Sequence, residues 1–110
     1  MATYYKILGQ VTPAANTANT VYTVPAATNT VISTVNVCNL DNVARAFRLA
    51  AVKSGEAIAN KHYLAYETAI PASDSIALTI GITLSANDSI SVFANNTANI
   101  AFSVFGSEIV

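Results

Sequence analysis

Apolar residues alternate with small polar residues in short runs along the whole chain, and turn-forming residues separate the runs. Alternation with a period of two is typical of β-strands that are buried on one face. Between Ala72 and Ala94 the pattern Ala-x-Asp-Ser-Ile occurs twice, each time at the start of an alternating run. Asp and Ser favour turns because their side-chain oxygens bond nearby backbone N–H groups. We therefore expect antiparallel strands here, with two equivalent turns at one end of the domain.

The same pattern predicts eight or nine strands, with turn signals about every ten residues. They cover residues 4–11, 20–24, 30–38, 44–53, 61–67, 76–80, the residues after Gly81, 90–92 and 100–104. In the strand 30–38 we expect Val31, Val35 and Val37 on one face and Ile32 on the other. Gly106 should let the backbone turn after the last strand.

The sequence offers few segments that could form a helix. Residues 54–60 are the only segment that could hold a helical turn, and we expect a loop there because Gly55 interrupts a segment too short to be a stable helix. The spacing of the strands predicts an all-β fold. We expect an antiparallel β-sandwich or jelly-roll of about eight strands with no substantial helix, and a barrel is the alternative.

The composition indicates one domain with few charges. A chain of 110 residues has the size of a single domain, and we expect one β-sandwich domain over residues 1–110. Charged residues make up only 10% of the chain, against roughly 25% in an average soluble domain. Thr, Asn, Ser and Ala must then cover most of the surface. Neighbouring subunits can cover such a surface without desolvating many ions, which favours a protein packed in an assembly.

Charge and hydropathy argue against two classes of partner. The net charge is −1, and the five Lys and Arg residues are too few and too scattered to neutralise a nucleic-acid backbone. No apolar run approaches the ~20 residues of a membrane helix. The first residues also lack the apolar stretch of a signal peptide. We expect a soluble protein that has no signal peptide and binds neither nucleic acid nor membrane.

His62 and Cys38 are the only residues of their types. His62 could act as a general base, but no nucleophile accompanies it, so we expect a structural or exposed role. A single cysteine excludes an internal disulfide, and we expect Cys38 to be a small core residue. One His and one Cys cannot form a zinc site, which needs four ligands.

Acidic and amide side chains at the turns are candidates for calcium ligands. Asp74, Asn87 and Asp88 offer the oxygen atoms that calcium prefers, but turn formation is the simpler explanation. Asn87 and Asn95 each begin a glycosylation sequon, which we expect to be coincidental without a secretory signal. The sequence has no glycine-rich phosphate loop and no nucleophile motif. We expect no catalytic, cofactor-binding or metal-binding residue, no cofactor and no enzyme activity.

Tyrosines are the remaining candidates for binding. The chain has five: Tyr4, Tyr5, Tyr22, Tyr63 and Tyr66. Together they could form a sugar-binding platform. More often, such residues lie at the edge of a core or at a subunit interface.

Several short segments occur in a characteristic order. They are Val-Tyr-Thr-Val-Pro-Ala at 21–26, Val-Asn-Val-Cys-Asn at 35–39, Ala-Tyr at 65–66 before Ile-Pro at 70–71, Asp-Ser-Ile at 88–90 and Phe-Gly-Ser-Glu-Ile at 105–109. In this order the chain resembles small virion structural proteins of tailed bacteriophages, including cyanobacterial phages. The resemblance extends from about Tyr22 to Ile109. Such proteins are all-β modules of the capsid surface or the tail, and the resemblance carries over no functional residue.

The resemblance implies a structural protein of the virion. We expect a capsid decoration (cement) protein, a homotrimer that binds the major capsid protein and stabilises the outer shell by bridging capsid subunits. It would be made in the host cytoplasm and located on the capsid surface. The alternative is a tail or baseplate component that contacts tail proteins and binds host glycans. A third hypothesis, a hydrolase fragment, has only His62 in its favour.

Overall fold

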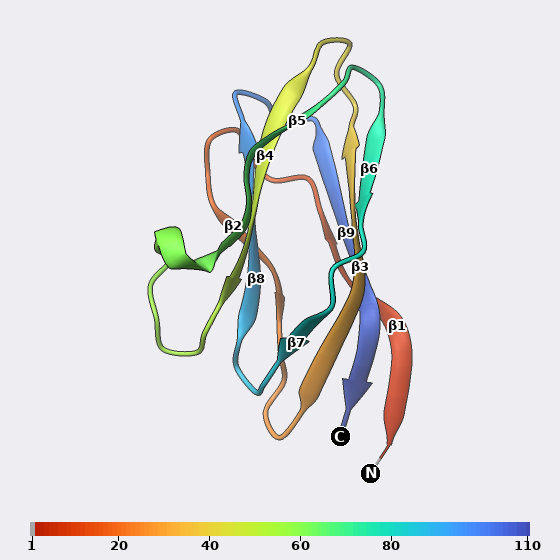
Figure 1. The fold of residues 1–110 in the computed structure, drawn as a ribbon, viewed down its shortest axis with the longest axis vertical. Coiled ribbons are helices and arrows are strands. Elements are labelled where there is room, and N and C mark those ends of the chain that lie inside the picture. Colours follow the sequence, from red (N-terminus) through yellow and green to blue (C-terminus); the bar gives the residue numbers. More distant parts are fainter. Residues whose placement is uncertain (1) are drawn as a thin grey trace.

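A computed structural model describes residues 2–110 as two antiparallel β-sheets that face each other (Figure 1). The strands are β1 (Thr3–Val11), β2 (Asn19–Thr23), β3 (Asn29–Asn39), β4 (Arg45–Val52), β5 (Tyr63–Ile70), β6 (Ser75–Leu78), β7 (Ile82–Leu84), β8 (Ser89–Asn95) and β9 (Ile100–Ile109). One turn of 3₁₀ helix, η1, covers Asn60–His62. The prediction of an all-β sandwich without substantial helix is confirmed.

Strands that are distant in sequence lie side by side in both sheets. The first sheet has the order β1-β9-β3-β6, and β7 also pairs with β3; the second has the order β2-β8-β4-β5. β3 pairs with β6 along its C-terminal half and with β7 along its N-terminal half. The chain crosses from one sheet to the other several times, so each sheet holds strands from both halves of the sequence.

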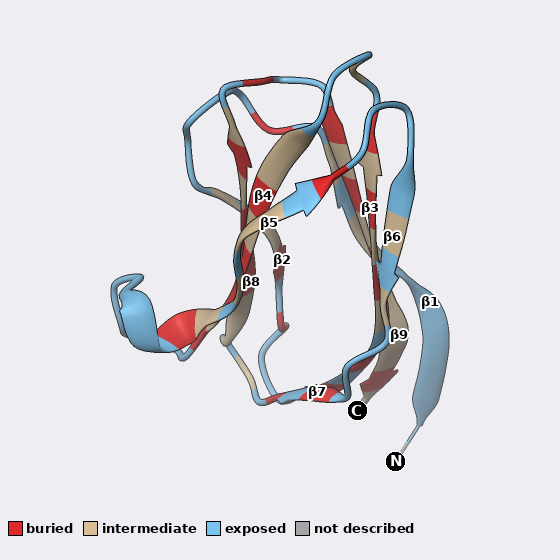
Figure 2. Cartoon of the chain, turned by 45° about the horizontal axis from the view of Figure 1, so that its top comes forward, coloured by how far each residue is buried: buried red, intermediate tan, exposed pale blue. Residues whose placement is uncertain are grey.

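The core lies between the two sheets (Figure 2). Phe47 and Leu49 of β4 are fully buried, as are Phe102 and Val104 of β9. The Phe47 and Phe102 rings meet edge to face, with their centroids 6.0 Å apart. Each such side chain contributes about 1.5–3 kcal/mol when it leaves water. Alternating apolar positions of both sheets therefore supply the main stabilisation of the fold.

The faces of β3 differ from the prediction because of a β-bulge. The pairing of β3 with β9 shifts register between Ile32 and Thr34. An extra residue in a strand exchanges the faces of the residues that follow it. Ile32 is consequently buried together with Val35 and Val37, whereas Val31 lies on the outer face, 37% exposed. The prediction that Val31 shares a face with Val35 and Val37 was wrong.

Gly106 also has a different role from the one expected. It does not end the last strand, because β9 continues to Ile109. It lies where β9 crosses the bulge of β3, so a Cβ at this position would contact the Val31 carbonyl oxygen and lie 2.9 Å from the Ile32 Cα. Real side chains do not approach a backbone so closely. Gly106 is therefore needed for the close approach of the two strands.

The two Ala-x-Asp-Ser-Ile segments form the same turn, but at opposite ends of the sandwich. In each, the residue before Asp has a positive φ, 55° at Ser73 and 68° at Asn87. The backbone carbonyl of Asp74 accepts a hydrogen bond from the N–H of Asn39, the last residue of β3. The backbone carbonyl of Asp88 accepts one from the N–H of Val24. The turns are at the top and the bottom of Figure 1, respectively. The prediction of one shared end was wrong, because β6 and β7 pair with opposite halves of β3.

A third copy of this turn precedes β3. Ala27 has a φ of 56° and lies between Ala26 and Thr28, just before the first residue of the strand. The sign of φ is that of a type II turn at its third residue, where glycine or asparagine is usual. The sequence predicts a turn over residues 26–29, but not its likeness to the other two, because Thr28 stands where they have Asp.

Residues 54–59 form a loop, as predicted, and the helical turn follows it. η1 occupies Asn60–His62, where the sequence pattern predicted the start of a strand. β5 begins at Tyr63 and runs to Ile70, past the predicted end at Glu67. None of the helical residues within 2–110 belongs to a helix of the length and apolarity needed to cross a membrane.

Candidate functional site

The five tyrosines lie in three separate places and form no single platform. Tyr22 is buried between the sheets, where its hydroxyl donates to the Glu108 carboxylate. Tyr4 and Tyr5 lie on β1, the edge strand of the first sheet. Tyr63 and Tyr66 lie on β5, the edge strand of the second sheet. Two exposed surfaces on different sheets are therefore candidates for binding.

Arg48 is the centre of the surface on the second sheet. Its guanidinium lies 4.1 Å from the centre of the Phe93 ring and 4.5 Å from that of Tyr66. It also forms an ion pair of 2.6 Å with the Glu67 carboxylate. The Tyr63 and Tyr66 rings meet edge to face, with 4.9 Å between centroids and 77° between planes. We call Arg48, Tyr63, Tyr66, Glu67 and Phe93 the arginine–aromatic cluster.

Two register shifts in the pairing of β5 with β4 bring these side chains together, and the shift at Leu64 puts Tyr63 on the same face as Tyr66. Leu49 pairs with Ala65 and Phe47 with Thr68, so Tyr66 and Glu67 together face Arg48. Glu67 has a φ of 51°, the left-handed conformation that often accompanies a bulge. Across the other edge of β4, Phe93 pairs directly with Arg48.

The charges of the cluster cancel. Arg48 donates to Glu67 through both Nε and an Nη, and the Asn95 amide donates to the second Glu67 oxygen at 3.2 Å. The hydrogen bond to Glu67 is the largest cause that raises the pKa of the Arg48 guanidinium above its ordinary value. A guanidinium held by a carboxylate and two rings has few other rotamers. The cluster is therefore a rigid, nearly neutral surface.

Beside the cluster lies a hollow of about 310 Å³. Its lining consists of the two rings of Tyr63 and Tyr66 and of Asn60, from the start of η1. Tyr66 is 55% exposed. The hollow thus combines two fixed aromatic walls with an amide, which is the composition of many small-molecule sites.

β1 forms the second exposed surface, at the edge of the first sheet. Its pairing is with β9 on one side, and the first five residues of the strand are exposed (Figure 2). Apolar side chains occupy both faces there: Tyr4 is 56% exposed, Tyr5 85% and Ile7 54%. An edge strand with apolar residues on both faces invites pairing with another chain. We call residues 3–7 the β1 edge.

The outer face of the first sheet extends the β1 edge. Tyr5 pairs with Ser107 of β9, which pairs with Val31 of β3. These residues line a hollow of about 450 Å³ together with Phe105 and Gly106. The bulge of β3 contributes directly, because it turns Val31 outward. The exposed apolar surface therefore runs from the strand edge onto the sheet.

His62 is buried, and both of its ring nitrogens are engaged. The Ala59 N–H donates to Nδ1 at 2.9 Å, so Nε2 carries the proton and lies 2.9 Å from the Glu56 carboxylate. Lys61 bonds the same carboxylate. The Lys61 bond and then the His62 bond hold the pKa of Glu56 below its ordinary value. His62 closes the loop 54–59 onto η1, which is a structural role.

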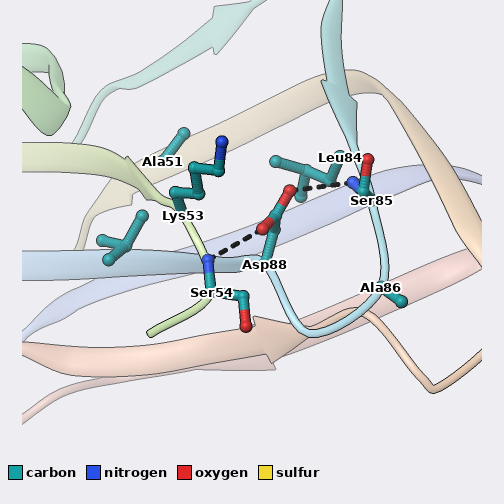
Figure 3. A pocket seen from close by; sticks show the side chains of 8 residues that line it. Ala51, Lys53, Ser54, Leu84, Ser85, Ala86 and Asp88 are labelled. Atoms are coloured by element: carbon teal, nitrogen blue, oxygen red, sulfur yellow. Dashed lines mark hydrogen bonds between the residues drawn. The ribbon is translucent and has the colours of Figure 1, made fainter. Parts of the chain in front are cut away.

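Both oxygens of the Asp88 carboxylate accept hydrogen bonds from backbone N–H groups (Figure 3). One oxygen accepts the Ser54 N–H at 2.8 Å and the other accepts the Ser85 N–H at 2.9 Å. Asp74 similarly accepts the Ser75 N–H at 2.8 Å. The turn-forming interpretation of both residues is confirmed. Within residues 2–110, no three His, Cys, Asp or Glu side chains gather where they could hold a metal ion.

Cys38 lies outside the core. Val37 and Asn39, its neighbours in β3, are buried, whereas Cys38 is half-buried on the opposite face and is a free thiol. The expectation that Cys38 is a core residue was wrong. The bulge of β3 precedes Cys38 and sets which residues of the following segment point inward.

Asp41 organises one end of the sandwich. Its carboxylate accepts bonds from the Thr97 hydroxyl, the Asn99 amide and the Arg45 guanidinium. The bonds from Thr97 and then Asn99 are the largest causes that lower its pKa. Its carbonyl accepts the Ser73 N–H. Asp41 therefore ties three loops together and is a structural residue.

Comparisons of the chain with models of protein families, with curated proteins and with solved structures found no match.

Proposed function

We propose that the chain is a virion structural protein of a tailed phage, a decoration protein that binds the major capsid protein on the outer shell. It stabilises the shell by bridging neighbouring capsid subunits. The β1 edge is the single observation that supports this proposal most directly. The resemblance in sequence supplies the class of assembly, and the β1 edge supplies a surface through which the subunits of a trimer would pair, so that three copies bind the shell together.

The β1 edge has what an assembly interface needs. Backbone groups along its outer side are available for strand pairing, and Tyr4, Tyr5 and Ile7 supply apolar area on both faces. Fully burying one such side chain contributes about 1.5–3 kcal/mol. Tyrosine is also enriched at interfaces, because its ring packs while its hydroxyl bonds. A neighbouring subunit would cover all three side chains at once.

The proposal includes a homotrimer. In a closed ring, β1 of one subunit meets a different surface of the next, which removes an exposed edge from each copy. Three copies on one axis also multiply weak contacts with the shell into strong overall binding. With 10% charged residues, the chain would desolvate few ions when it assembles.

The proposed role is not enzymatic. His62 and Asp88, the two side chains of the sequence that most resembled catalytic or metal-binding groups, are bonded to backbone groups within the fold. Glu108 is bonded to Tyr22 and Lys6. These groups stabilise loops and the contact between the sheets, which favours a scaffold over a catalyst.

Immunogold electron microscopy of the intact virion tests the proposal. Antibody raised against the purified chain should label the surface of phage heads. Adding the purified chain to shells stripped of it should restore labelling, and the double variant Tyr5→Ser with Ile7→Ser should restore less than a tenth. Ile58→Ser, which changes an exposed residue of the loop 54–59, is the matched control. Label confined to tails would overturn the proposal.

The second candidate is a tail or baseplate component that binds host glycans. The hollow beside Tyr63 and Tyr66 favours it, because aromatic walls suit sugar rings. Tail labelling in the same micrographs, together with binding of the chain to host cells, would support this role. Head labelling would exclude it as the main role.

A further inference from the structure

We infer that the hollow between Tyr63, Tyr66 and Asn60 is a binding site for one neutral sugar ring. The inference concerns the second sheet, whereas the proposed assembly surface is on the first. Binding at the hollow does not depend on where the chain lies in the virion. The two proposals therefore fail or succeed separately.

The shape of the hollow fits a ring that has both apolar and polar atoms. Its volume of about 310 Å³ is near the lower end of small-molecule pockets, which span about 300–1,000 Å³. The rings of Tyr63 and Tyr66 stand at 77° and form two walls of a corner. A pyranose presents a row of C–H groups that pack on the negative face of an aromatic ring. Its hydroxyls point outward from that contact.

The lining residues carry polar groups that match those hydroxyls. Asn60 contributes an amide, which both donates and accepts hydrogen bonds. The phenolic hydroxyls of Tyr63 and Tyr66 can also donate and accept. A sugar hydroxyl needs partners of both kinds, and the three residues provide them without a formal charge. This combination selects a polyhydroxylated neutral ring over a purely apolar ligand.

Charge excludes two other ligand classes. The Arg48 guanidinium lies over the Tyr66 ring, 4.5 Å from its centre, so that face of the ring is already occupied and is not available to a cationic ligand. Glu67 already pairs with Arg48 at 2.6 Å, so the guanidinium is not free to attract an anion. A neutral ligand requires neither a free cation-binding face nor a free guanidinium.

The walls are held in place before a ligand arrives. Arg48 packs against Tyr66 and Phe93 and is itself held by Glu67. Tyr66 and Tyr63 support each other through their edge-to-face contact. Ligands bind more tightly to a surface whose side chains need no ordering. This explains the arginine–aromatic cluster as the support of the hollow.

Saturation-transfer NMR on the purified wild-type chain tests the inference. The probes are the methyl glycosides of glucose, galactose, mannose and N-acetylglucosamine. At least one should receive saturation at its ring C–H protons. Tyr66→Ala should weaken its binding at least tenfold, while Tyr66→Phe, which keeps the ring, should weaken it less than threefold. Leu40→Ala, which changes an exposed side chain outside the hollow and the β1 edge, is the control and should leave glycoside binding unchanged.

Two results would overturn the inference. One is the absence of transfer to all four glycosides. The other is equal binding by wild type and Tyr66→Ala. Because Tyr66 is more than half exposed, Tyr66→Ala should fold, and its urea midpoint checks this. If Tyr66→Ala instead lowers the mass of the oligomer and leaves sugar binding intact, the hollow is a subunit contact and the inference is wrong.

Discussion

The Tyr22 hydroxyl donates a hydrogen bond of 2.6 Å to the Glu108 carboxylate, and this bond joins the two sheets. Tyr22 belongs to β2 and Glu108 to β9, and both side chains are buried. The Tyr22 oxygen also lies 2.8 Å from the Thr30 hydroxyl, which therefore donates to it. Burial, and then the bond to Glu108, raise the pKa of Tyr22 to about 12. Tyr22 thus remains a neutral donor under ordinary conditions.

Replacing Tyr22 with Phe should lower the free energy of unfolding by about 1–3 kcal/mol, because buried partners of the hydroxyl lose a hydrogen bond. Urea denaturation followed by circular dichroism measures the change. Tyr4→Phe, at an exposed ring of β1, is the control and should stay within about 0.5 kcal/mol of wild type. Equal effects of the two substitutions would contradict a structural role for the Tyr22–Glu108 bond.

Glu108 should make stability depend on acid pH. The Lys6 ammonium, 2.6 Å away, and then Tyr22 lower the pKa of Glu108 below its ordinary 4.5. A carboxyl with a depressed folded pKa stabilises above its unfolded pKa, and this contribution is lost as the pH falls through the folded value. The urea midpoints of wild type and Glu108→Gln should therefore differ most at pH 7 and converge below pH 4.5. A difference that stays constant down to pH 3 would refute this assignment.

Ala27→Gly should stabilise the protein. Ala27 has a φ of 56°, which strains an L side chain by about 1–2 kcal/mol. Glycine removes that strain but has a more flexible unfolded state, so the net gain should be about 0.5–1 kcal/mol. Ala26→Gly, one residue earlier and outside the positive-φ positions, should destabilise instead. Thermal unfolding should show a higher melting temperature than wild type for Ala27→Gly and a lower one for Ala26→Gly. A lower melting temperature for Ala27→Gly would contradict the prediction.

Gly106→Ala should destabilise strongly, by about 2 kcal/mol or more, because overpacking at a fixed backbone forces strands apart. The new methyl group would contact the backbone of Val31 and Ile32. Gly81→Ala is the matched control, since a Cβ there meets nothing within 4 Å. Chemical denaturation should show little change for Gly81→Ala. If the two variants are equally stable, the close approach of β9 to β3 does not depend on Gly106.

The strands were predictable because apolar and polar residues alternate, and this alternation gave the fold class directly. Which residues of β3 face the core was not predictable from the sequence. A bulge between Ile32 and Thr34 exchanges inside and outside, and nothing in the residues Ile-Ser-Thr marks it. The same bulge explains why Gly106 is a contact residue of two strands: its requirement arises from a strand distant in sequence.

The candidate sites were predictable only in part. Tyr63 and Tyr66 were among five candidate tyrosines, but they share a face because the pairing of β5 with β4 shifts register at Leu64, between them. The contact of Glu67 with Arg48 depends on a second shift, where Glu67 has a positive φ, which its residue type rarely adopts. Arg48 and Phe93 escaped notice because they are far apart in sequence and adjacent only through the pairing of β4 with β8. The shared turn of Asp74 and Asp88 was predictable from local chemistry, whereas its position depended on strand pairing.

The solution mass of the purified chain, measured by size-exclusion chromatography with light scattering, tests most directly whether the β1 edge is an assembly surface. Wild type and Ile58→Ser should each have a mass three times that of one chain. The double variant Tyr5→Ser with Ile7→Ser should have the mass of one chain, with an unchanged circular dichroism spectrum. A wild-type chain that is monomeric at every concentration, or a double variant that remains trimeric, would contradict this role of the β1 edge.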